Sequence, residues 1–249
     1  MRIATYNIWN ASAGMPHRFE QIVEQIAAVN ADILCLQEVA NVAQHAALEA
    51  RLPAAQGVFC AHQGSAEGLS VFSRYPLELL CDGNDAQVVR CRMGEKTAVL
   101  ANVHLPWENA LDRERAILKI TDAVCREQGD MKLLLGDFNC SDRSGVHQYL
   151  LGQSSLLGKA AVPCWFDLAE SMADFKNQRP ECTVDFRQNP RWQGANTIEC
   201  CQRFDRIYLQ NPYPQPFPVL RSCGIFGRKV SDLTHLAASD HDGVYADLD

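Results

Sequence analysis

The chain has 249 residues, 47% of them hydrophobic, and a formal net charge of −7 at pH 7. It is long enough for a sizeable core and suits one α/β domain, which we expect to span residues 1–249. The acidic balance argues against broad electrostatic capture of nucleic acid. No apolar run reaches the roughly 20 residues that a membrane-spanning helix needs.

Helices and strands alternate at the beginning of the chain. Residues 3–9 predict a strand, and residues 16–29 carry apolar side chains at helical spacing behind an initial proline, which predicts a helix. Residues 32–39 are apolar at nearly every position, which is typical of a strand buried on both faces. A short helix is expected at residues 42–52.

The rest of the chain is richer in strands. Strand-like runs with no long helix between them indicate antiparallel meanders at residues 58–61, 69–72, 77–80, 87–91 and 98–105. The later part predicts a helix at 112–126, a buried strand at 132–135, and loops mixed with strands at 204–209, 218–226 and 243–248. Two mixed β-sheets packed face to face and flanked by helices satisfy this order, so we expect a four-layer α/β/β/α sandwich.

The eleven cysteines lie mostly inside apolar runs, as Cys35 does, and no Cys-x-x-Cys pair suggests zinc or redox chemistry. We therefore expect all of them to be reduced apolar side chains. The N-terminus lacks the apolar stretch and cleavage site of a signal peptide. Together these features predict a cytoplasmic protein.

Polar side chains stand where several of the expected strands begin or end. Rigid strand ends that open into loops are where catalytic groups gather. Each residue alone also has a structural explanation: Asn7 as a turn cap, His104 as a hydrogen-bonded structural histidine, Asp137 and Asn139 as an Asx-turn. The motifs are Asn7, Gln37-Glu38, Asn102-Val103-His104, Gly136-Asp137-Phe138-Asn139, Phe204-Asp205-Arg206 and Ser239-Asp240-His241.

This ordered set resembles the endonuclease/exonuclease/phosphatase superfamily, whose fold is that of deoxyribonuclease I. The resemblance spans residues 3–248 and implies a metal-dependent phosphoric ester hydrolase. It implies Mg²⁺ as the cofactor, with Mn²⁺ as a possible substitute. Glu38 is expected to be the direct metal ligand, with Asn7 beside it and Asp240 as a second ligand or a supporting carboxylate.

The same resemblance implies the acid–base groups. Asp137 is expected to orient or deprotonate the attacking water, and Asn139 to donate to the phosphate or help hold the metal. His241 is expected to bind the phosphate oxyanion or act as a base, with Asp205 fixing its tautomer and raising its pKa. His104 is a candidate general acid for the leaving group.

The run Arg203-Phe204-Asp205-Arg206-Ile207 resembles 5′-tyrosyl-DNA phosphodiesterases most, which implies a substrate at DNA ends or another nuclease substrate. A phosphoinositide or sphingomyelin-type head-group phosphoesterase is the alternative. A catalytically inactive binding protein of the same fold is disfavoured, because Glu38, Asp137 and His241 are all present.

Residues 185–194 are expected to lie between two strands as a loop. They would form a substrate loop if Arg187 or Arg191 contacts phosphate and Trp192 stacks on a base or an aromatic leaving group. A solvated loop with one packed tryptophan explains the same residues equally well.

Overall fold

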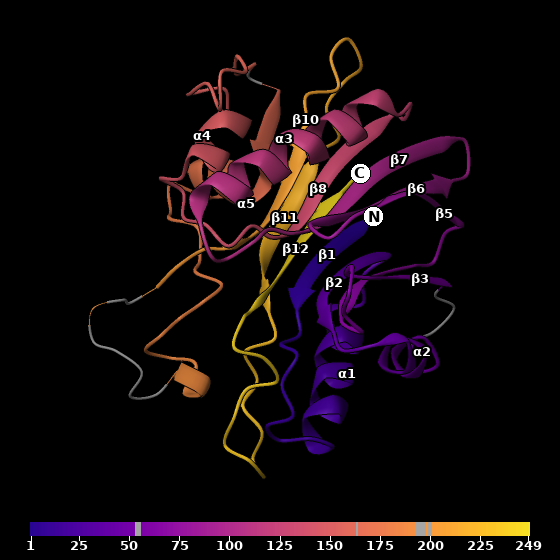
Figure 1. The fold of residues 1–249 in the computed structure, drawn as a ribbon, viewed down its shortest axis with the longest axis vertical. Coiled ribbons are helices and arrows are strands. Elements are labelled where there is room, and N and C mark those ends of the chain that lie inside the picture. The colour runs from indigo at the N-terminus through magenta and orange to yellow at the C-terminus, as the bar shows by residue number, and fades with distance from the viewer. Residues whose placement is uncertain (53–55, 163, 193–197, 199–200) are drawn as a thin grey trace.

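The computed structural model describes residues 1–52, 56–162, 164–192, 198 and 201–249. Within these residues, two six-stranded sheets lie face to face between outer helices (Figure 1). The first sheet contains, in spatial order, β11 (Leu220–Phe226), β12 (Gly243–Leu248), β1 (Arg2–Asn7), β2 (Ile33–Val39), β4 (Gly68–Ser73) and β3 (Gln56–Ala61). The second contains β5 (Leu77–Asp82), β6 (Ala86–Met93), β7 (Lys96–His104), β8 (Met131–Asp137), β10 (Asp205–Gln210) and β9 (Trp165–Asp167).

The helices cover the outer faces of the sheets. The first sheet is covered by α1 (His17–Val29) and α2 (Val42–Glu49), and the second by α3 (Ala110–Arg126) and α4 (Gly145–Leu150). A further helix, α5 (Leu168–Phe175), packs against β10 and β11. Three buried apolar clusters result, one between the sheets and one under each helical layer. The expected four-layer α/β/β/α sandwich of two mixed sheets is confirmed.

The sheet pairing explains why distant motifs meet. β1 and β2 are parallel, with Asn7 opposite Gln37, and β7 and β8 are parallel, with His104 opposite Asp137. β10 runs antiparallel to β8, so its first residue, Asp205, lies opposite Asp137. The carboxyl ends of four strands and the amino end of a fifth therefore come together at one end of the two sheets.

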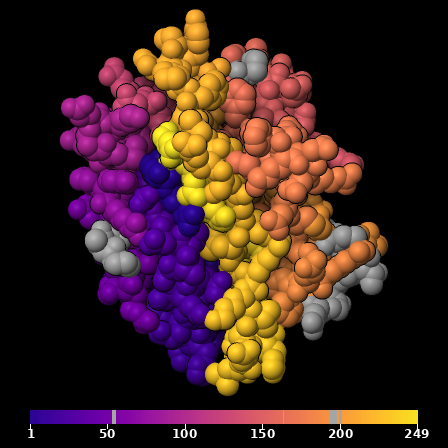
Figure 2. Space-filling model, turned by 180° about the vertical axis from the view of Figure 1, so that it is seen from behind, coloured from indigo at the N-terminus to yellow at the C-terminus, as the bar shows by residue number. Residues whose placement is uncertain are grey.

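The two ends of the chain lie side by side. β12 pairs antiparallel with β1, and Figure 2 shows the yellow C-terminal segment running along the indigo N-terminal segment. This pairing brings the residues before β12 to the end of β1. Ser239 and His241 thereby reach the same end of the first sheet as Asn7.

The main differences from the sequence-based expectations lie between residues 140 and 202. α4, α5, β9 and a 3₁₀ turn at Pro190–Trp192 fall where only loops and strands were expected. Both helices have side-chain caps: Ser144 accepts from the backbone of His147, and Asp167 accepts from Ala169 and Glu170. They are six and eight residues long, so their apolar patterns are too short to stand out.

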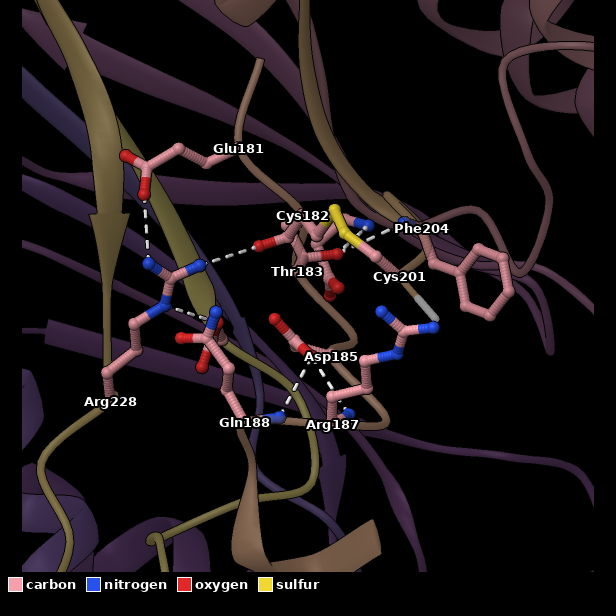
Figure 3. Close-up of a disulfide and its surroundings, with 11 residues drawn as sticks. Glu181, Cys182, Thr183, Asp185, Arg187, Gln188, Cys201, Phe204 and Arg228 are labelled. Atoms are coloured by element: carbon pink, nitrogen blue, oxygen red, sulfur yellow. Dashed lines mark hydrogen bonds and ion pairs between the residues drawn. A yellow bond between two sulfur atoms is a disulfide. The ribbon is translucent and has the colours of Figure 1, made fainter. Parts of the chain in front are cut away.

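The prediction that every cysteine is reduced is wrong. Cys182 and Cys201 form a disulfide across 19 positions (Figure 3). The backbone around them pairs as a small antiparallel bridge between Val184 and Gln202, which brings the two segments together. Nothing in the local sequence indicates this pairing. The disulfide also weakens the argument for the cytoplasm that rested on cysteine usage.

Eight of the other cysteines are free, and Cys200 lies outside the described residues. Four of the free thiols are buried, as expected for apolar side chains, whereas Cys81 and Cys125 are exposed. Among the helices that the structure describes, none is long and apolar enough to cross a membrane.

Candidate active site

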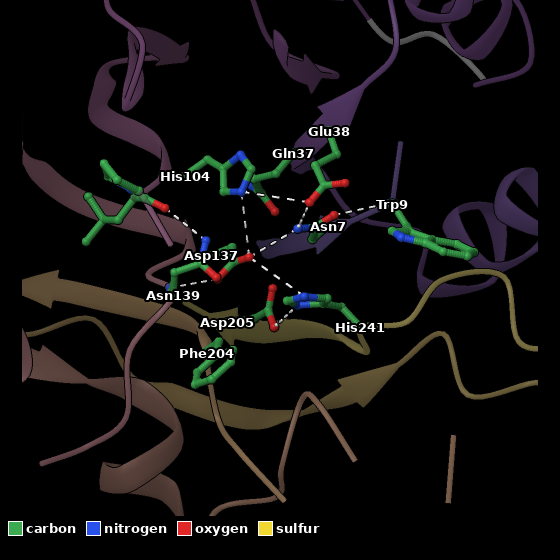
Figure 4. Close-up of polar contacts among 12 residues, drawn as sticks. Asn7, Trp9, Gln37, Glu38, His104, Asp137, Asn139, Phe204, Asp205 and His241 are labelled. Atoms are coloured by element: carbon green, nitrogen blue, oxygen red, sulfur yellow. Dashed lines mark hydrogen bonds and ion pairs between the residues drawn. The ribbon is translucent and has the colours of Figure 1, made fainter. Parts of the chain in front are cut away.

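The side chain of Asn7 joins the two sheets. Its Nδ2 donates to Glu38 Oε1 at 2.9 Å and to Asp137 Oδ2 at 3.1 Å (Figure 4). Asn7 is the last residue of β1 and Glu38 the second-to-last of β2 in the first sheet, and Asp137 is the last residue of β8 in the second. The Oδ1 of Asn7 accepts from the backbone N–H of Trp9 at 3.0 Å. In this arrangement Glu38 is better placed than Asn7 to hold a cation.

The backbone is left-handed at three non-glycine positions beside the site. Trp9 and Glu38 both have φ 58°, and Asn139 has φ 46°. Such conformations are unfavourable by about 1–3 kcal/mol each and persist where the surroundings enforce them. At Glu38 the second carboxylate oxygen accepts from the backbone of Asn10 at 2.8 Å, which holds the side chain at the strand end.

The Gly136-Asp137 step fixes the second carboxylate. Gly136 has φ 149°, and a Cβ there would lie 1.9 Å from the carbonyl oxygen of Val103, so the position requires glycine. Asp137 is buried, and its Oδ1 accepts from the backbone of Asn139 at 2.8 Å. The Asn139 Nδ2 donates to the carbonyl of Leu105 at 2.9 Å, so this amide also supports the backbone after β7.

Asp205 and His241 meet, as the sequence predicted. His241 Nδ1 lies 2.8 Å from Asp205 Oδ2, and its Nε2 lies 3.8 Å from Asp137 Oδ2. Burial alone would lower the pKa of His241, but Asp205, Asp137 and Asp240 together raise it well above its usual value. The three carboxylates therefore favour the protonated form of the ring.

His104 completes the group from the opposite side. Its Nε2 lies 3.9 Å from Glu38 Oε1 and 3.9 Å from Asp137 Oδ2. Its side chain is 17% exposed, so it borders both the cluster and solvent. Both imidazoles thus lie near Asp137, while His104 also faces Glu38 and His241 also faces Asp205.

Asp240 lies close enough to this group for its carboxyl to be influenced by Glu38 and His241. Burial raises the pKa of its carboxyl, and Glu38 adds to the effect. Ser239 Oγ donates to the carbonyl of Asn7 at 2.7 Å and lies 3.3 Å from Asp240 Oδ1. Ser239 therefore attaches the last motif to β1, a role that the sequence alone did not reveal.

Further hydrogen bonds that the sequence did not reveal support the backbone of the site. Gln37 Nε2 donates to Asn102 Oδ1 at 2.6 Å, and Asn102 Nδ2 donates to the carbonyls of Leu36 and Ser70. Both amides are fully buried and tie the two sheets together. Thr183 Oγ accepts from the backbone of Asp205 at 3.1 Å. Gln37 and Asn102 belong to recognisable motifs, but no sequence signal marks Thr183.

The expected substrate loop packs partly against the site's own backbone. Trp192 Nε1 donates to the carbonyl of Asp240 at 2.9 Å, and its ring packs on Phe186. Arg191 Nε donates to the carbonyl of Ala237, and its guanidinium lies over the Trp9 ring. Arg187 follows a turn at Asp185 (Figure 3). Residues 193 and 194 of this loop lie outside the described residues.

The charge of the site suits a divalent cation. Glu38, Asp137, Asp205 and Asp240 gather within a small volume, and among the described residues no lysine or arginine forms an ion pair with any of them. Asp137, Asp205 and His241 also offer ligand atoms within 4.8 Å of one another. Hard oxygen donors with excess negative charge are the set that Mg²⁺ and Mn²⁺ prefer.

The sequence model of the Endonuclease/Exonuclease/phosphatase family matches residues 4–241. The chain belongs to this family. Members are generally hydrolases of phosphoester bonds, so the coarse enzyme class predicted from the motifs is supported. No curated protein sequence matches the chain at a significant level.

Solved structures share the fold at low sequence identity. TDP2 from D. rerio, complexed with single strand DNA product, aligns with a TM-score of 0.77 at 16% identity, covering 100% of this chain and 98% of that chain. Truncated TDP2 from Caenorhabditis elegans aligns at 0.76 and 19%, covering 99% and 96%. A mannosyl-6-phosphatase from Bacteroides thetaiotaomicron aligns at 0.72 and 15%, covering 100% and 99%. These agree with the resemblance inferred from the motifs.

Proposed function

We propose that the protein is a Mg²⁺-dependent phosphodiesterase that hydrolyses phosphate esters at DNA ends, in the manner of 5′-tyrosyl-DNA phosphodiesterases. The observation that carries the proposal is the bridge from Asn7 to both Glu38 and Asp137. His104 lies 3.9 Å from both carboxylates, and His241 lies 3.8 Å from Asp137. The bound DNA product in the D. rerio TDP2 structure supports a nucleic-acid substrate for this fold.

Glu38 would hold the cation, and we assign Asn7 and Asp240 as its further oxygen ligands. When bound, Mg²⁺ supplies positive charge against a non-bridging phosphate oxygen and the leaving oxygen; Mn²⁺ would substitute. Asn7 Oδ1 accepts one hydrogen bond, from the backbone of Trp9, and its second lone pair would be available to the cation.

The proton chemistry falls to the side chains around that position. Asp137, acidic and buried, accepts a proton from the attacking water. His241 donates from its imidazolium to the phosphate oxyanion while Asp205 holds its ring. His104 donates a proton to the leaving oxygen from the solvent side. Asn139 holds the backbone after β7 through Leu105, and we assign its amide as a further donor to phosphate.

The substrate would extend over the loop that contains Trp192. Arg187 and Arg191 are the cations we assign to phosphate, and Trp192 to stacking on a base or on the tyrosyl ring. Trp192 and Arg191 already contact the backbone of the Asp240 segment, so their contribution would come from the faces that remain exposed. We place the activity in the cytoplasm. The free cysteines favour this location and the disulfide argues against it. Cell fractionation tests the assignment.

A substrate panel tests the proposal. A 5′-phosphotyrosyl oligonucleotide, an unmodified single strand, mannose 6-phosphate and a phosphoinositide would be compared in Mg²⁺, Mn²⁺ and chelator. We expect divalent-dependent release of tyrosine to be the fastest reaction. Faster hydrolysis of the sugar phosphate, suggested by the mannosyl-6-phosphatase of similar fold, or of the phosphoinositide would overturn the DNA-end assignment.

A further inference from the structure

A second group of metal-ligand side chains lies beside the active site. His62, Glu67 and His104 each offer a ligand atom, and these atoms lie within 4.8 Å of one another. All three side chains are partly exposed, between 17% and 26%. We propose that they form a binding site for a borderline transition-metal ion of the Zn²⁺ type, separate from the Mg²⁺ position at Glu38.

A short turn between β3 and β4 presents two of these ligands together. His62 N donates to the carbonyl of Glu67 at 2.8 Å, and Ser65 N donates to the carbonyl of His62 at 3.0 Å. Glu67 N in turn donates to Ser65 Oγ at 3.0 Å. The turn is thus closed by three hydrogen bonds, which hold His62 and Glu67 on the same side before any ion arrives.

The side chains are spaced for a shared ligand. His62 Nε2 lies 3.9 Å from Glu67 Oε1, which is too long for a hydrogen bond. Two donors on one tetrahedral Zn²⁺, each at about 2.1 Å, are separated by about 3.4 Å, so a small adjustment suffices. Glu67 Oε2 accepts from Asn10 Nδ2 at 2.5 Å, which fixes the carboxylate while leaving Oε1 available.

The ligand chemistry distinguishes this group from the catalytic carboxylates. Two imidazoles and one carboxylate favour Zn²⁺ and its neighbours, whereas an all-oxygen set favours Mg²⁺. Among the described residues, no arginine or lysine forms an ion pair with Glu67. His147, Asp167 and Glu170 are grouped as closely, but Arg203 and Arg206 already neutralise their carboxylates.

An ion at this site would change catalysis through His104. Coordination uses the lone pair of a ring nitrogen and fixes the ring, so His104 could no longer exchange a proton with the leaving group. We therefore infer that Zn²⁺ at His62, Glu67 and His104 inhibits hydrolysis even when Mg²⁺ is saturating. This consequence rests on the proposed function, whereas binding itself does not.

Calorimetric titration of the whole chain with Zn²⁺ in saturating Mg²⁺ tests the binding. We expect His62→Ala and Glu67→Gln to weaken Zn²⁺ binding by at least about tenfold, because mutations around a metal site commonly reduce metal affinity by about 10- to 100-fold. His17→Ala, at an exposed position of α1, is the matched histidine control and should bind Zn²⁺ as the parent does. Glu38→Gln should also retain Zn²⁺.

Histidine NMR distinguishes Zn²⁺ binding at the proposed site from Zn²⁺ binding to the exposed thiols of Cys81 and Cys125. Zn²⁺ should shift the ring signals of His62 and His104 and leave those of His17 unchanged. Zn²⁺ affinity unaffected by His62→Ala, or lost in Glu38→Gln while retained in His62→Ala, would overturn the site.

The inhibitory effect needs a separate assay on whichever substrate the panel identifies. His62→Ala should keep Mg²⁺-dependent activity and raise the Zn²⁺ concentration for half-inhibition by about tenfold. An inhibition curve identical to that of the parent would overturn the link to His104. Because the calorimetry requires no turnover, an incorrect substrate assignment leaves the binding result interpretable.

Discussion

The two faces of β10 carry clusters of similar residue types that behave differently. Asp205 and Arg206 are neighbours in the chain, and their side chains point to opposite faces of the strand. Asp205 faces Asp137 and His241 in the candidate active site. Arg206 faces Asp167 under α4 and α5, where it is fully buried.

Charge balance separates these clusters. Asp167 accepts from Arg203 at 2.6 Å and from Arg206 at 3.0 Å. Burial alone would raise the pKa of Asp167, but the two guanidinium groups lower it. The catalytic carboxylates, in contrast, have only histidines as ion-pair partners among the described residues. The Asp167 cluster, whose carboxylates are neutralised by arginines, therefore stabilises the fold. The catalytic cluster keeps excess negative charge, which suits the binding of a cation.

The largest expected effect comes from removing charge on the unbalanced side. Glu38→Gln should abolish divalent-dependent hydrolysis, because the amide keeps the shape but not the charge that holds the cation. Folding should be retained, since the side chain is 23% exposed and contributes little to the core. Activity across a Mg²⁺ titration, with circular dichroism for folding, provides the measurement.

Glu108→Gln, an exposed substitution before α3, serves as the matched control and should hydrolyse substrate as the parent does. Full activity in Glu38→Gln, or in excess chelator, would contradict the metal assignment.

The next effect tests the balanced side. Asp167→Asn should reduce the free energy of unfolding by about 3–5 kcal/mol, because it removes the nearest counter-ion of the fully buried Arg206 and leaves only the more distant Glu170. Asparagine can still cap α5, so the loss reports the charge. Hydrolysis by the remaining folded protein should be unchanged, in contrast to Glu38→Gln.

The stabilisation that Asp167 provides depends on pH. An acid whose pKa is lowered on folding stabilises the protein above its unfolded pKa, and that stability is lost as pH falls through the folded pKa. The difference in unfolding free energy between parent and Asp167→Asn should therefore narrow in acid. Asp174→Asn, exposed on the same helix, should change stability little; a similar loss there would contradict the role of the ion pairs.

Sequence-based prediction succeeded where hydrophobic period and motif order carry the information. The strand that ends at Val39 and the pairing of Asp205 with His241 were expected, and the first strand, expected at residues 3–9, lies at Arg2–Asn7. It failed where a partner lies far away. Arg203 and Arg206 were interpreted as markers of a family branch, yet both bind Asp167, 36 and 39 positions away.

The expectation that all cysteines are reduced failed for the same physical reason. Neither Cys182 nor Cys201 has a local pattern that indicates its partner, since a bridge between non-neighbouring segments brings them together. Short helices such as α4 escaped notice because six residues show less than two turns of periodicity. Long-range partnership and short capped elements are thus the information that one sequence does not contain.

The third prediction concerns this disulfide, which lies next to the catalytic side of β10. Thr183 follows Cys182 and accepts from the backbone of Asp205, so the disulfide holds a support of the active site. Cys182→Ser should reduce the free energy of unfolding by about 3 kcal/mol, as expected for a closed loop of this size. Urea denaturation with and without reductant measures it.

Cys200→Ser is the matched control and should retain both the disulfide and the parent's stability. Mass spectrometry of alkylated, unreduced protein distinguishes Cys200 from Cys201. Equal stability of parent and Cys182→Ser under oxidising conditions would show that the disulfide contributes nothing to the folded state.

The smallest of the four effects concerns Asp205, which acts on the reaction through His241. Asp205→Asn should reduce activity by about 10- to 100-fold, the usual cost of removing a carboxylate that orients a functional imidazole. It should leave Mg²⁺ affinity largely unchanged, because Glu38 does not contact Asp205 within the described residues. Activity at varied Mg²⁺ separates the two quantities.

The pH profile shows whether Asp205 does more than hold the fold. The pKa of His241 is raised by carboxylates against the opposing effect of burial, so replacing Asp205 must lower it. If the reaction needs the imidazolium, Asp205→Asn should lose activity at a lower pH than the parent does. The alkaline limb of its rate profile should therefore move toward neutral pH. The raised pKa of His241 also stabilises the folded protein. This stabilisation is fully present below the unfolded pKa of about 6.5 and is lost as pH rises through the folded pKa, and Asp205→Asn should remove it.

Asp242→Asn is the control, because it removes a buried carboxylate that pairs with Arg228 instead. It should shift the titration of His241 far less. An unaltered His241 titration in Asp205→Asn, followed by histidine NMR, would mean that the 2.8 Å contact does not set the protonation of the ring.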